Sequence, residues 1–349
     1  MEKLTVVIAT YNSEKTLEKV LIALRNQTYP QEYIEILLID GGSTDATLEL
    51  GNKYGCIVID NPKTEPVHAK LIGVREATGR YLMTLDHDEV LENRDSIKLR
   101  INELQAHPEC KVAFCSGYKR PEDYPLLNQY ISEFGDPFSM YMYNFSKDWK
   151  FYEKALKRCC AVVDESETYV KYSLQHLRKS IIVELCCLAT IIDLQYFKRE
   201  LHIDENEKKM VHAFYYMLEH GEYDVLLTKN DPLVHYSVDS LKAYFPKLKW
   251  RVCNNVHFAE KGENGFEGRQ KYMKVTPLKK YGFIFYSFLV PISFVHALTL
   301  AISRRNIVYL LHPLLCLYVS LEIVWQMMLK VMGITPQFKS YDGRKKIAR

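Results

Sequence analysis

The chain has 349 residues, 48% of them apolar and 26% charged, which is enough for one large α/β domain with additions or for two ordinary domains. A formal net charge of +3 is too small to favour nucleic acid as a partner. Nine cysteines without a Cys-x-x-Cys pair favour reduced, cytoplasmic thiols over disulfides or a metal site. We expect no signal peptide, because the first apolar run, residues 4–9, is too short.

Strand-like and helix-like patterns alternate over the first third of the chain. Short apolar runs predict strands, and segments with apolar residues at helical spacing lie between them. The predicted strands are residues 4–9, 34–39, 56–59 and 81–85. The predicted helices are 16–24 with Ser13 as N-cap, one that begins near Ser43 or Thr44, and 68–77 with Gly79 as a left-handed terminator. This order predicts an α/β fold with a mostly parallel sheet flanked by helices.

Polar residues follow three of these predicted strands. They are Thr10-Tyr11-Asn12, Asp40-Gly41-Gly42-Ser43 and Asp86-His87-Asp88. Ligands of parallel sheets bind at the carboxyl ends of the strands, so we expect the three clusters to meet at one edge. Each cluster also has a plain structural interpretation, as a core aromatic, a turn former or exposed turn acids, and only their combination favours a site.

The chemistry of the three clusters suits a nucleotide and a metal ion. Asp86 and Asp88 project to the same side of an extended segment, where two carboxylates can bind a hard divalent cation and leave further positions for a diphosphate. Tyr11 offers an aromatic face to a base and Asn12 an amide, while Asp40 can accept a hydrogen bond from a base or a ribose. Gly41 and Gly42 permit close backbone approach.

The rest of the chain divides into a middle part and an apolar tail. In the middle part, residues 181–194 fit either a buried strand or a helix. In the tail, residues 282–302 contain no acid, Lys or Arg, and residues 307–328 contain only Glu322. Each segment is long enough to cross a hydrocarbon core of about 30 Å, which predicts a helical hairpin in a membrane. A pair of buried soluble helices is the alternative.

Basic residues flank the two apolar segments and predict that both ends of the hairpin are cytoplasmic. Arg304 and Arg305 between the segments argue against a full crossing, and a re-entrant hairpin would keep them on the cytoplasmic side. Glu322 needs a partner in a membrane, for which His296 and His312 are candidates, or it faces the catalytic domain. The flanking basic residues are Arg269, Lys271, Lys274, Lys279 and Lys280 before the first segment, and Lys339, Arg344, Lys345, Lys346 and Arg349 after the second.

The first 100 or so residues resemble family 2 glycosyltransferases, the inverting group with the GT-A fold that includes polyprenyl-phosphate sugar synthases and cell-surface polysaccharide enzymes. The resemblance is carried by residues 7–12, 39–45, 69–82 and 85–88. It implies that Thr10, Tyr11, Asn12, Asp40, Lys70 and Asp86 bind a nucleoside diphosphate sugar, and that Asp88, with Asp86, holds Mn²⁺ or Mg²⁺. Gly41 departs from the family, where a second Asp is frequent, and Lys70 stands where Arg is common.

The resemblance persists more weakly to about residue 255. It implies that residues 188–193 form a strand on the acceptor side and that the catalytic base follows, for which the candidates are Asp204, Glu205 and Glu207. Acids that only favour a helix N-terminus are the alternative. It also implies His235 as a metal or diphosphate ligand, although a buried structural histidine would fit equally. Basic residues at 247–251 would suit a phosphate-bearing lipid.

We therefore expect a membrane-anchored, metal-dependent inverting glycosyltransferase at the cell membrane, with its catalytic domain cytoplasmic. The expected divisions are a catalytic domain at 1–260 with a nucleotide-sugar half (1–100) and an acceptor half (101–260), a basic linker at 261–281, the hairpin at 282–328 and a basic tail at 329–349. The expected acceptor is a membrane lipid, a lipid-linked glycan or a surface polysaccharide. A degenerate transferase acting as a membrane scaffold or sugar-binding partner is one alternative, and a sugar nucleotidyltransferase is another. Sugar nucleotidyltransferases usually have a Gly-rich loop after the first strand, and this chain has no such loop there.

Overall fold

The structure is a computed structural model that describes residues 1–177, 181, 183, 185–257 and 278–336. The described chain forms two compact units. Unit 1 comprises Met1–Lys119, Asp148–Lys179 and Val183–Tyr236, and unit 2 comprises Arg120–Lys147, Ser180–Ile182 and Ser237–Arg349. The basic residues expected at 269–274 and at 339–349 lie outside the described residues.

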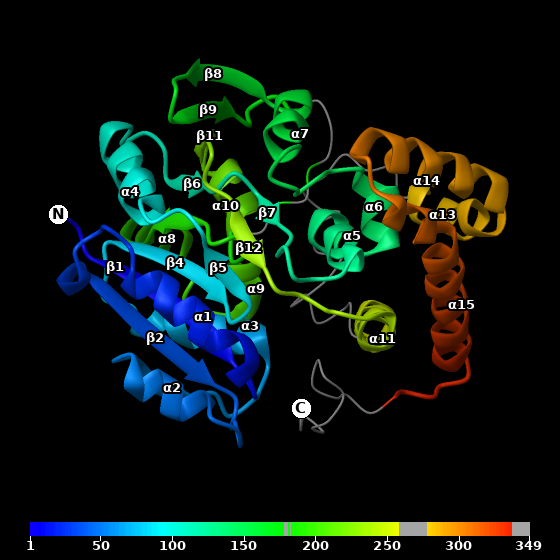
Figure 1. The fold of residues 1–349 in the computed structure, drawn as a ribbon, viewed down its shortest axis with the longest axis horizontal. Helices are drawn as coiled ribbons and strands as arrows, with labels where there is room; N and C mark the ends of the chain where they lie inside the picture. The colour runs from blue at the N-terminus through cyan, green and yellow to red at the C-terminus, as the bar shows by residue number, and fades with distance from the viewer. Residues whose placement is uncertain (178–180, 182, 184, 258–277, 337–349) are drawn as a thin grey trace. The chain divides into compact units, whose positions relative to one another are not determined.

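Unit 1 contains a nine-stranded sheet in the order β3-β2-β1-β4-β10-β6-β11-β9-β8 (Figure 1). The first four strands are parallel, as the sequence predicts, whereas β10 runs antiparallel to both of its neighbours, so the whole sheet is mixed. The strands are β1 (Leu4–Thr10), β2 (Ile34–Asp40), β3 (Ile57–Asp60), β4 (Tyr81–Asp86), β6 (Val112–Phe114), β8 (Ala161–Glu165), β9 (Tyr169–Ser173), β10 (Ile191–Asp193) and β11 (Asp224–Thr228).

A second, three-stranded sheet in unit 1 has the order β5-β12-β7, with β12 antiparallel to β5 and parallel to β7. Its strands are only two or three residues long. They are β5 (Glu89–Leu91), β7 (Tyr118–Lys119) and β12 (Leu233–His235).

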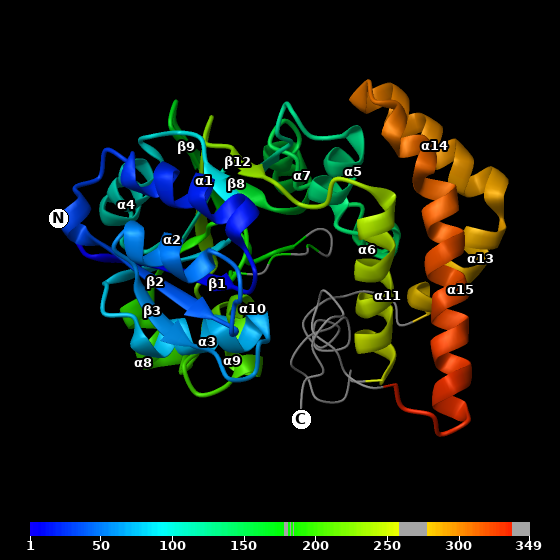
Figure 2. The same ribbon diagram turned by 60° about the horizontal axis from the view of Figure 1, so that its bottom comes forward.

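Helices cover both faces of the large sheet, with α1 and α3 on opposite sides (Figure 2). Helix α3 comes close to β1 because Gly73 has no side chain, and a Cβ there would lie 2.2 Å from Val7 Cγ1. The helices of unit 1 are α1 (Glu14–Arg25), α2 (Thr47–Lys53), α3 (Pro66–Glu76), α4 (Ser96–Ala106), α7 (Tyr152–Cys159), α8 (Leu194–Leu201), α9 (Glu207–Val211) and α10 (Ala213–Glu219), with a 3-10 turn η1 (Gln31–Tyr33).

Two local expectations about helix ends are wrong. Helix α2 begins at Thr47, later than expected, because Asp45 Oδ1 accepts from the backbone N–H of Thr47. Gly79 does not adopt a positive φ. A Cβ there would lie 2.7 Å from both Thr5 N and Tyr81 O, so the glycine allows two backbone segments to approach rather than ending a helix.

Unit 2 is helical, and its core joins helices that are far apart in the sequence. Helix α15 passes the length and hydropathy test for a membrane span as part of the segment Ile307–Val331, and α13 with α14 passes only as a pair bent by 93°. The first apolar segment is therefore broken near Leu289 rather than one straight helix. The helices are α5 (Leu126–Phe134), α6 (Pro137–Tyr143), α11 (Leu241–His257), α13 (Lys279–Phe288), α14 (Val290–Arg304) and α15 (His312–Val331), with a 3-10 turn η3 (Ile307–Leu311).

Candidate active site

The three polar clusters lie at the carboxyl ends of β1, β2 and β4, which are neighbours in the sheet. In the parallel register Thr10 pairs with Asp40, and Ala9 pairs with Asp86. The ends of these strands therefore coincide, and the clusters share one edge of the sheet, as expected from strand order.

The carboxylate of Asp40 organises the loop that follows β2. One oxygen accepts from Thr10 Oγ1 at 3.0 Å and from Ser43 Oγ at 2.5 Å, and the other accepts from the backbone N–H groups of Gly42 and Ser43 at 2.9 and 2.7 Å. Asp40 is only 4% exposed. The side chain thus has a clear structural role in shaping the loop, and direct contact with a base or ribose stays a proposal.

The loop after β1 is tied to the loop after β2. The N–H of Asn12 donates to Ser43 Oγ at 2.8 Å, and Asn12 Oδ1 accepts from the N–H of Thr44 at 2.9 Å. Asn12 has φ 50°, a left-handed conformation that asparagine tolerates better than most residues. Half-buried Tyr11 lies between this turn and β1. The two loops form one scaffold at the sheet edge.

The departure from the family at Gly41 has a steric cause that sequence reasoning missed. A Cβ on Gly41 would lie 2.9 Å from Thr64 Cγ2 and 3.2 Å from Thr64 Cα. Thr64 follows β3 and donates from its hydroxyl to the carbonyl of Gly41 at 2.9 Å. An aspartate at position 41 would displace this loop.

Lys70 of α3 and Asp86 of β4 form an ion pair with Nζ and Oδ1 2.7 Å apart. Lys70 is buried and also donates to the carbonyl of Cys186 at 2.7 Å. Burial disfavours the charged form of Lys70, but the Asp86 carboxylate outweighs it and raises the pKa well above its usual range. Burial likewise opposes the charge on Asp86, and Lys70 more than offsets this, so its pKa is lowered.

Asp88 and His235 lie next to each other, with Oδ2 and Nε2 3.7 Å apart and both side chains 16% exposed. The antiparallel pairing of β5 and β12 places them there, and the N–H of Tyr236 donates to the Asp88 carbonyl at 2.7 Å. The Tyr118 ring stacks on the imidazole with 4.5 Å between centroids. His87 lies with Asp88 in the turn between β4 and β5 and instead contacts Thr16 of α1.

The chemistry of these donors fits a divalent cation. A carboxylate and an imidazole suit Mn²⁺, and a carboxylate with diphosphate oxygens suits Mg²⁺. Within the described part of the chain no group of three or more His, Cys, Asp or Glu side chains could hold a metal alone. One carboxylate oxygen of Asp86, Oδ1, is paired with Lys70. Any bound cation would therefore need oxygen ligands from the donor as well as Asp88 and His235.

Glu89 is a buried acid at this site that sequence reasoning did not identify. Its carboxyl group accepts from Tyr118 Oη at 2.5 Å and from the N–H of Asp86 at 3.1 Å. Burial first, and then the charges of Asp86 and Asp88, raises its pKa to about 8. The available signal was an acid that follows Asp86-His87-Asp88 directly and begins an apolar strand.

The three candidate bases lie in two places along α3. Glu207 Oε1 is 2.7 Å from His68 Nδ1 and 3.0 Å from Lys63 Nζ. Asp204 and Glu205 instead accept through their backbone carbonyls from Arg75 in the last turn of α3. His68 and Arg75 are separated by about 10 Å of helix. Glu207 contacts His68, which is two residues from Lys70, so Glu207 is the candidate nearer to Lys70.

The environment of Glu207 keeps it ionised. Burial opposes the charge, but hydrogen bonds from its own backbone N–H, His68 and Lys63 outweigh it and lower the pKa to about 2. The Glu205 side chain is exposed and pairs with Lys209 at 2.8 Å. Asn206 caps α9 by accepting from the N–H of Lys209, so the acids also lie where they favour the helix dipole.

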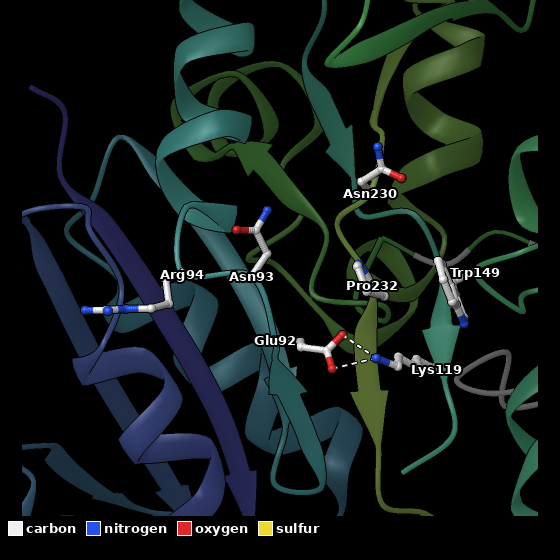
Figure 3. Close-up of a pocket in the computed structure, with 7 residues that line it drawn as sticks. All are labelled: Glu92, Asn93, Arg94, Lys119, Trp149, Asn230 and Pro232. Carbon is white, nitrogen blue, oxygen red and sulfur yellow. Dashed lines mark hydrogen bonds and ion pairs between the residues drawn. The ribbon is translucent and has the colours of Figure 1, made fainter. Parts of the chain in front are cut away.

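A depression of about 510 Å³ lies on unit 1, away from these residues (Figure 3). Its wall includes the ion pair of Glu92 with Lys119 at 2.6 Å, and the indole of Trp149. Glu92 follows β5 at the end opposite Asp88, about 13 Å further along the strand. The depression is therefore separate from the candidate donor site.

Comparison with known proteins identifies the family. The sequence model described as Glycosyl transferase family 2 matches residues 5–161, which include all three strand-end clusters. Residues 5–161 therefore form a glycosyltransferase family 2 domain. The mannosyltransferase PcManGT from Pyrobaculum calidifontis, solved with GDP-Man and Mn²⁺, covers 93% of this chain and 87% of its own with a TM-score of 0.52. At 14% identity that similarity shows the GT-A fold alone.

Two curated relatives share short stretches with this chain. TarS of Staphylococcus aureus, a poly(ribitol-phosphate) beta-N-acetylglucosaminyltransferase, is 28% identical over 104 residues, 28% of this chain and 18% of TarS. A Methanococcus voltae enzyme, dolichyl N-acetyl-alpha-D-glucosaminyl phosphate 3-beta-D-2,3-diacetamido-2,3-dideoxy-beta-D-glucuronosyltransferase, is 37% identical over 90 residues, 24% of this chain and 28% of that enzyme. The matched stretches thus span less than a third of these relatives.

Proposed function

We propose that this chain transfers a sugar, with inversion, from a metal-bound nucleoside diphosphate sugar to an acceptor at a membrane. The observation that carries the proposal is the meeting of three strand-end clusters at one sheet edge, where Lys70–Asp86 and Asp88–His235 lie beside the loops of Asn12 and Asp40. The family and the GT-A fold set the reaction class.

The nucleotide would lie over the joined loops after β1 and β2. Tyr11 offers its ring to a base. The turn after β2 is held by the hydrogen bonds of Asp40, so the backbone of this turn has little freedom to rearrange when a nucleotide binds. Lys70 is held in place by Asp86 and by the carbonyl of Cys186, so its charge is fixed at the strand end. A fixed cation is favourable for a diphosphate because its position costs no reorganisation during the reaction.

A bound Mn²⁺ or Mg²⁺ would neutralise the charge that grows on the departing diphosphate. In this chain Asp88 and His235 are the residues to hold it, and Tyr118 fixes the plane of the imidazole. One of Asp204, Glu205 and Glu207 would accept the proton of a hydroxyl acceptor. Glu207 is a weak base while it is paired with His68 and Lys63, which favours an acceptor that is already anionic, such as a lipid phosphate.

The membrane part of the proposal is supported by the apolar helices of unit 2. Helices α13, α14 and α15 expose large apolar side chains along much of their length. The name of the Methanococcus voltae relative specifies a dolichyl phosphate-linked acceptor, and the name of TarS specifies a polymer acceptor. Holding the enzyme at the surface would raise the effective concentration of a lipid-borne acceptor.

Thermal unfolding with nucleoside diphosphates and metal tests the donor site. A nucleotide that binds the native state raises Tm by mass action, and we expect one nucleoside diphosphate with Mn²⁺ to do so more than the others. The shift should fall sharply in Asp88→Asn and persist in the control Asp123→Asn, whose side chain is exposed in unit 2. Equal shifts for all nucleotides in both variants would contradict the proposed site.

A further inference from the structure

Helices α13, α14 and α15 carry large apolar side chains that nothing in the described chain covers. Residues Phe285, Ile292, Val295, Ile302 and Leu321 are 71, 54, 63, 69 and 57% exposed. Soluble monomers rarely expose apolar patches of this extent. We call these side chains the apolar face: Tyr281, Phe285, Phe288, Leu289, Ile292, Phe294, Val295, Leu298, Ile302, Leu314, Leu321, Val324, Trp325, Met328 and Val331.

The apolar face is one side of each helix. On α15 the exposed residues Leu314, Leu321, Trp325 and Met328 recur at a helical spacing. The opposite side, which includes Val319, is buried in the core of unit 2. The helices thus present a single apolar side to their surroundings.

Both ends of the bent pair α13–α14 are attached to the same part of unit 2. At the start, Lys279 Nζ donates to the carbonyl of Met142 in α6 at 2.7 Å. At the end, Arg304 donates to Glu133 of α5, with Nη2 and Nε 2.9 and 3.0 Å from Oε1. Glu133 is fully buried and also accepts from Ser146 Oγ and Tyr309 Oη. The ion pair with Arg304 is therefore part of the core.

This attachment keeps Arg304 close to water. Glu122 and Asp123 are exposed and precede α5, and the nine residues of α5 extend only about 13 Å. A crossing requires about 30 Å of hydrocarbon. Arg304 therefore lies on the same side as those acids, and α13–α14 enters and leaves on that side.

Helix α15 is likewise attached along its length to a basic helix, α11, which lies beside it in both ribbon views (Figures 1 and 2). The Tyr318 and Phe245 rings are 4.4 Å apart, and Lys330 Nζ donates to the carbonyl of Val256 at 2.8 Å. Helix α11 contains four Lys or Arg residues and no acid, and Lys242 and Lys249 are exposed. A helix with such charges does not lie in hydrocarbon, so the end of α15 stays near water as well.

Glu322 fits this arrangement better than a membrane interior. Its carboxylate accepts from Gln326 Nε2 at 2.6 Å, and Gln326 Oε1 is 3.1 Å from His257 of α11. His296 and His312 contact Tyr286 instead of Glu322. The contact through Gln326 fits the other expectation, that Glu322 faces residues 1–260, which include α11. The acid lies in a polar contact with α11.

The charge around the apolar face suits an anionic lipid surface. Residues 278–336 contain Lys279, Lys280, Arg304, Arg305 and Lys330 against the single acid Glu322. Basic residues near a bilayer are attracted to anionic headgroups by roughly 1 kcal/mol each. We propose that α13, α14 and α15 form a monotopic surface that lies in one leaflet of an anionic bilayer and does not cross it. This inference rests on the proposed membrane association and specifies its geometry.

Side-specific labelling of membrane vesicles tests the geometry. Lys15→Cys in unit 1, Arg305→Cys after α14 and Thr335→Cys after α15 place thiols at exposed positions. Vesicles of both orientations are treated with a membrane-impermeant maleimide, and modified peptides are identified by mass. We expect all three thiols to be labelled from one side. Labelling of Arg305→Cys or Thr335→Cys only from the side opposite to Lys15→Cys would overturn the inference and leave the proposed chemistry intact.

Flotation with lipid vesicles tests the surface itself. We expect the protein to float with vesicles that contain anionic lipid at least tenfold better than with neutral vesicles. Phe285→Asp and Trp325→Asp should each lower vesicle binding about tenfold or more, whereas the control Ile22→Asp, an exposed apolar residue of α1, should not. Binding that is unchanged in both variants would overturn the proposed surface. Failure to float at all would overturn this inference together with the membrane part of the proposed function, whereas donor binding would be unaffected.

Discussion

Asp88 and His235 are 147 positions apart in the sequence, and a short antiparallel pair of strands brings their side chains to 3.7 Å. The sequence alone singles out Asp88 because it follows a buried strand two residues after another acid. It does not single out Glu89 or Thr64, whose roles depend on Tyr118 and Gly41 across the fold. Residues at strand ends were predictable because parallel strands end together, whereas partners brought in by later segments were not.

We expect Asp88→Asn to fold normally and to lose about a hundredfold or more in transfer rate. The amide keeps the shape of the side chain but removes the charge that would hold the cation, which costs several kcal/mol in the transition state. Rates at saturating donor over a series of Mn²⁺ concentrations measure the effect, with Asp123→Asn as the surface control. If Asp88→Asn turned over like the wild type, Asp88 would not be a metal ligand.

The pairing of Glu207 predicts a dependence of stability on pH. Its pKa is about 2 in the folded protein against 4.5 for a free glutamate, so the folded state favours the ionised form. The resulting stabilisation is fully present above pH 4.5 and is lost as the pH falls towards 2. We expect Glu207→Gln to lower the free energy of unfolding by roughly 1–3 kcal/mol at pH 7 and by less at pH 3.

Chemical denaturation at the two pH values measures this difference. Glu205→Gln is the matched control, since that exposed carboxylate pairs only with Lys209 and should contribute little. A difference between wild type and Glu207→Gln that is the same at pH 7 and pH 3 would contradict the assigned pairing. The transfer rate of Glu207→Gln also tests its role as the base, because a hydroxyl acceptor would then react about 10²–10⁴-fold more slowly.

At the scale of elements, the first four strands and α1 and α3 follow the predicted pattern closely. Their apolar residues have a regular period and their ends carry polar or glycine residues. Among the described residues of 181–194, Ile191–Asp193 forms a strand between β4 and β6, which the apolar sequence pattern could not distinguish from a helix. The break at Leu289 was also missed. Hydropathy reports that a segment lacks charge. It does not report whether the helix axis is straight or bent within that segment.

A buried ion pair connects α4 to the loop before β12, and it predicts a large loss of stability when one partner is removed. Arg100 Nε is 3.3 Å from Asp231 Oδ2, and the side chains are 0 and 1% exposed. Asp231→Ala would leave a buried guanidinium without its counter-ion, which costs about 3–5 kcal/mol. Denaturant unfolding measures the loss. Asp224→Ala, at a half-buried strand end, is the comparison, and an equal effect of the two substitutions would contradict the importance of the pair.

At the scale of the whole molecule, the division of the chain is interleaved. Residues of α5, α6 and α11 belong to unit 2 together with the C-terminal helices. Sequence reasoning placed a boundary near 260 because composition changes there. It had no means of showing that Glu133, in the middle of the chain, pairs with Arg304. A chain ended at Lys280 would lose Arg304 and Tyr309, two of the partners of that buried acid, so truncation is a poor test of the apolar helices.

Point substitution at the Glu133–Arg304 pair is a sharper test. We expect Arg304→Met to destabilise unit 2 by about 3–5 kcal/mol, because it leaves a fully buried carboxylate without its cation. The double variant Arg304→Met with Glu133→Gln should recover much of that loss, since the amide oxygen can accept from one of the Ser146 and Tyr309 hydroxyls and the amide N–H can donate to the other. Thermal unfolding of both variants measures the coupling.

The same pair of variants distinguishes the two units. The residues proposed to bind the donor all lie in unit 1, so the Tm increase caused by the nucleoside diphosphate with Mn²⁺ should persist in Arg304→Met for the transition that reports unit 1. Vesicle binding should fall in the single variant, because the apolar face depends on the packing of α14 and α15 against α5, and it should return in the double variant. Loss of donor binding in the single variant, with recovery in the double variant, would instead show that the two units fold as one cooperative structure.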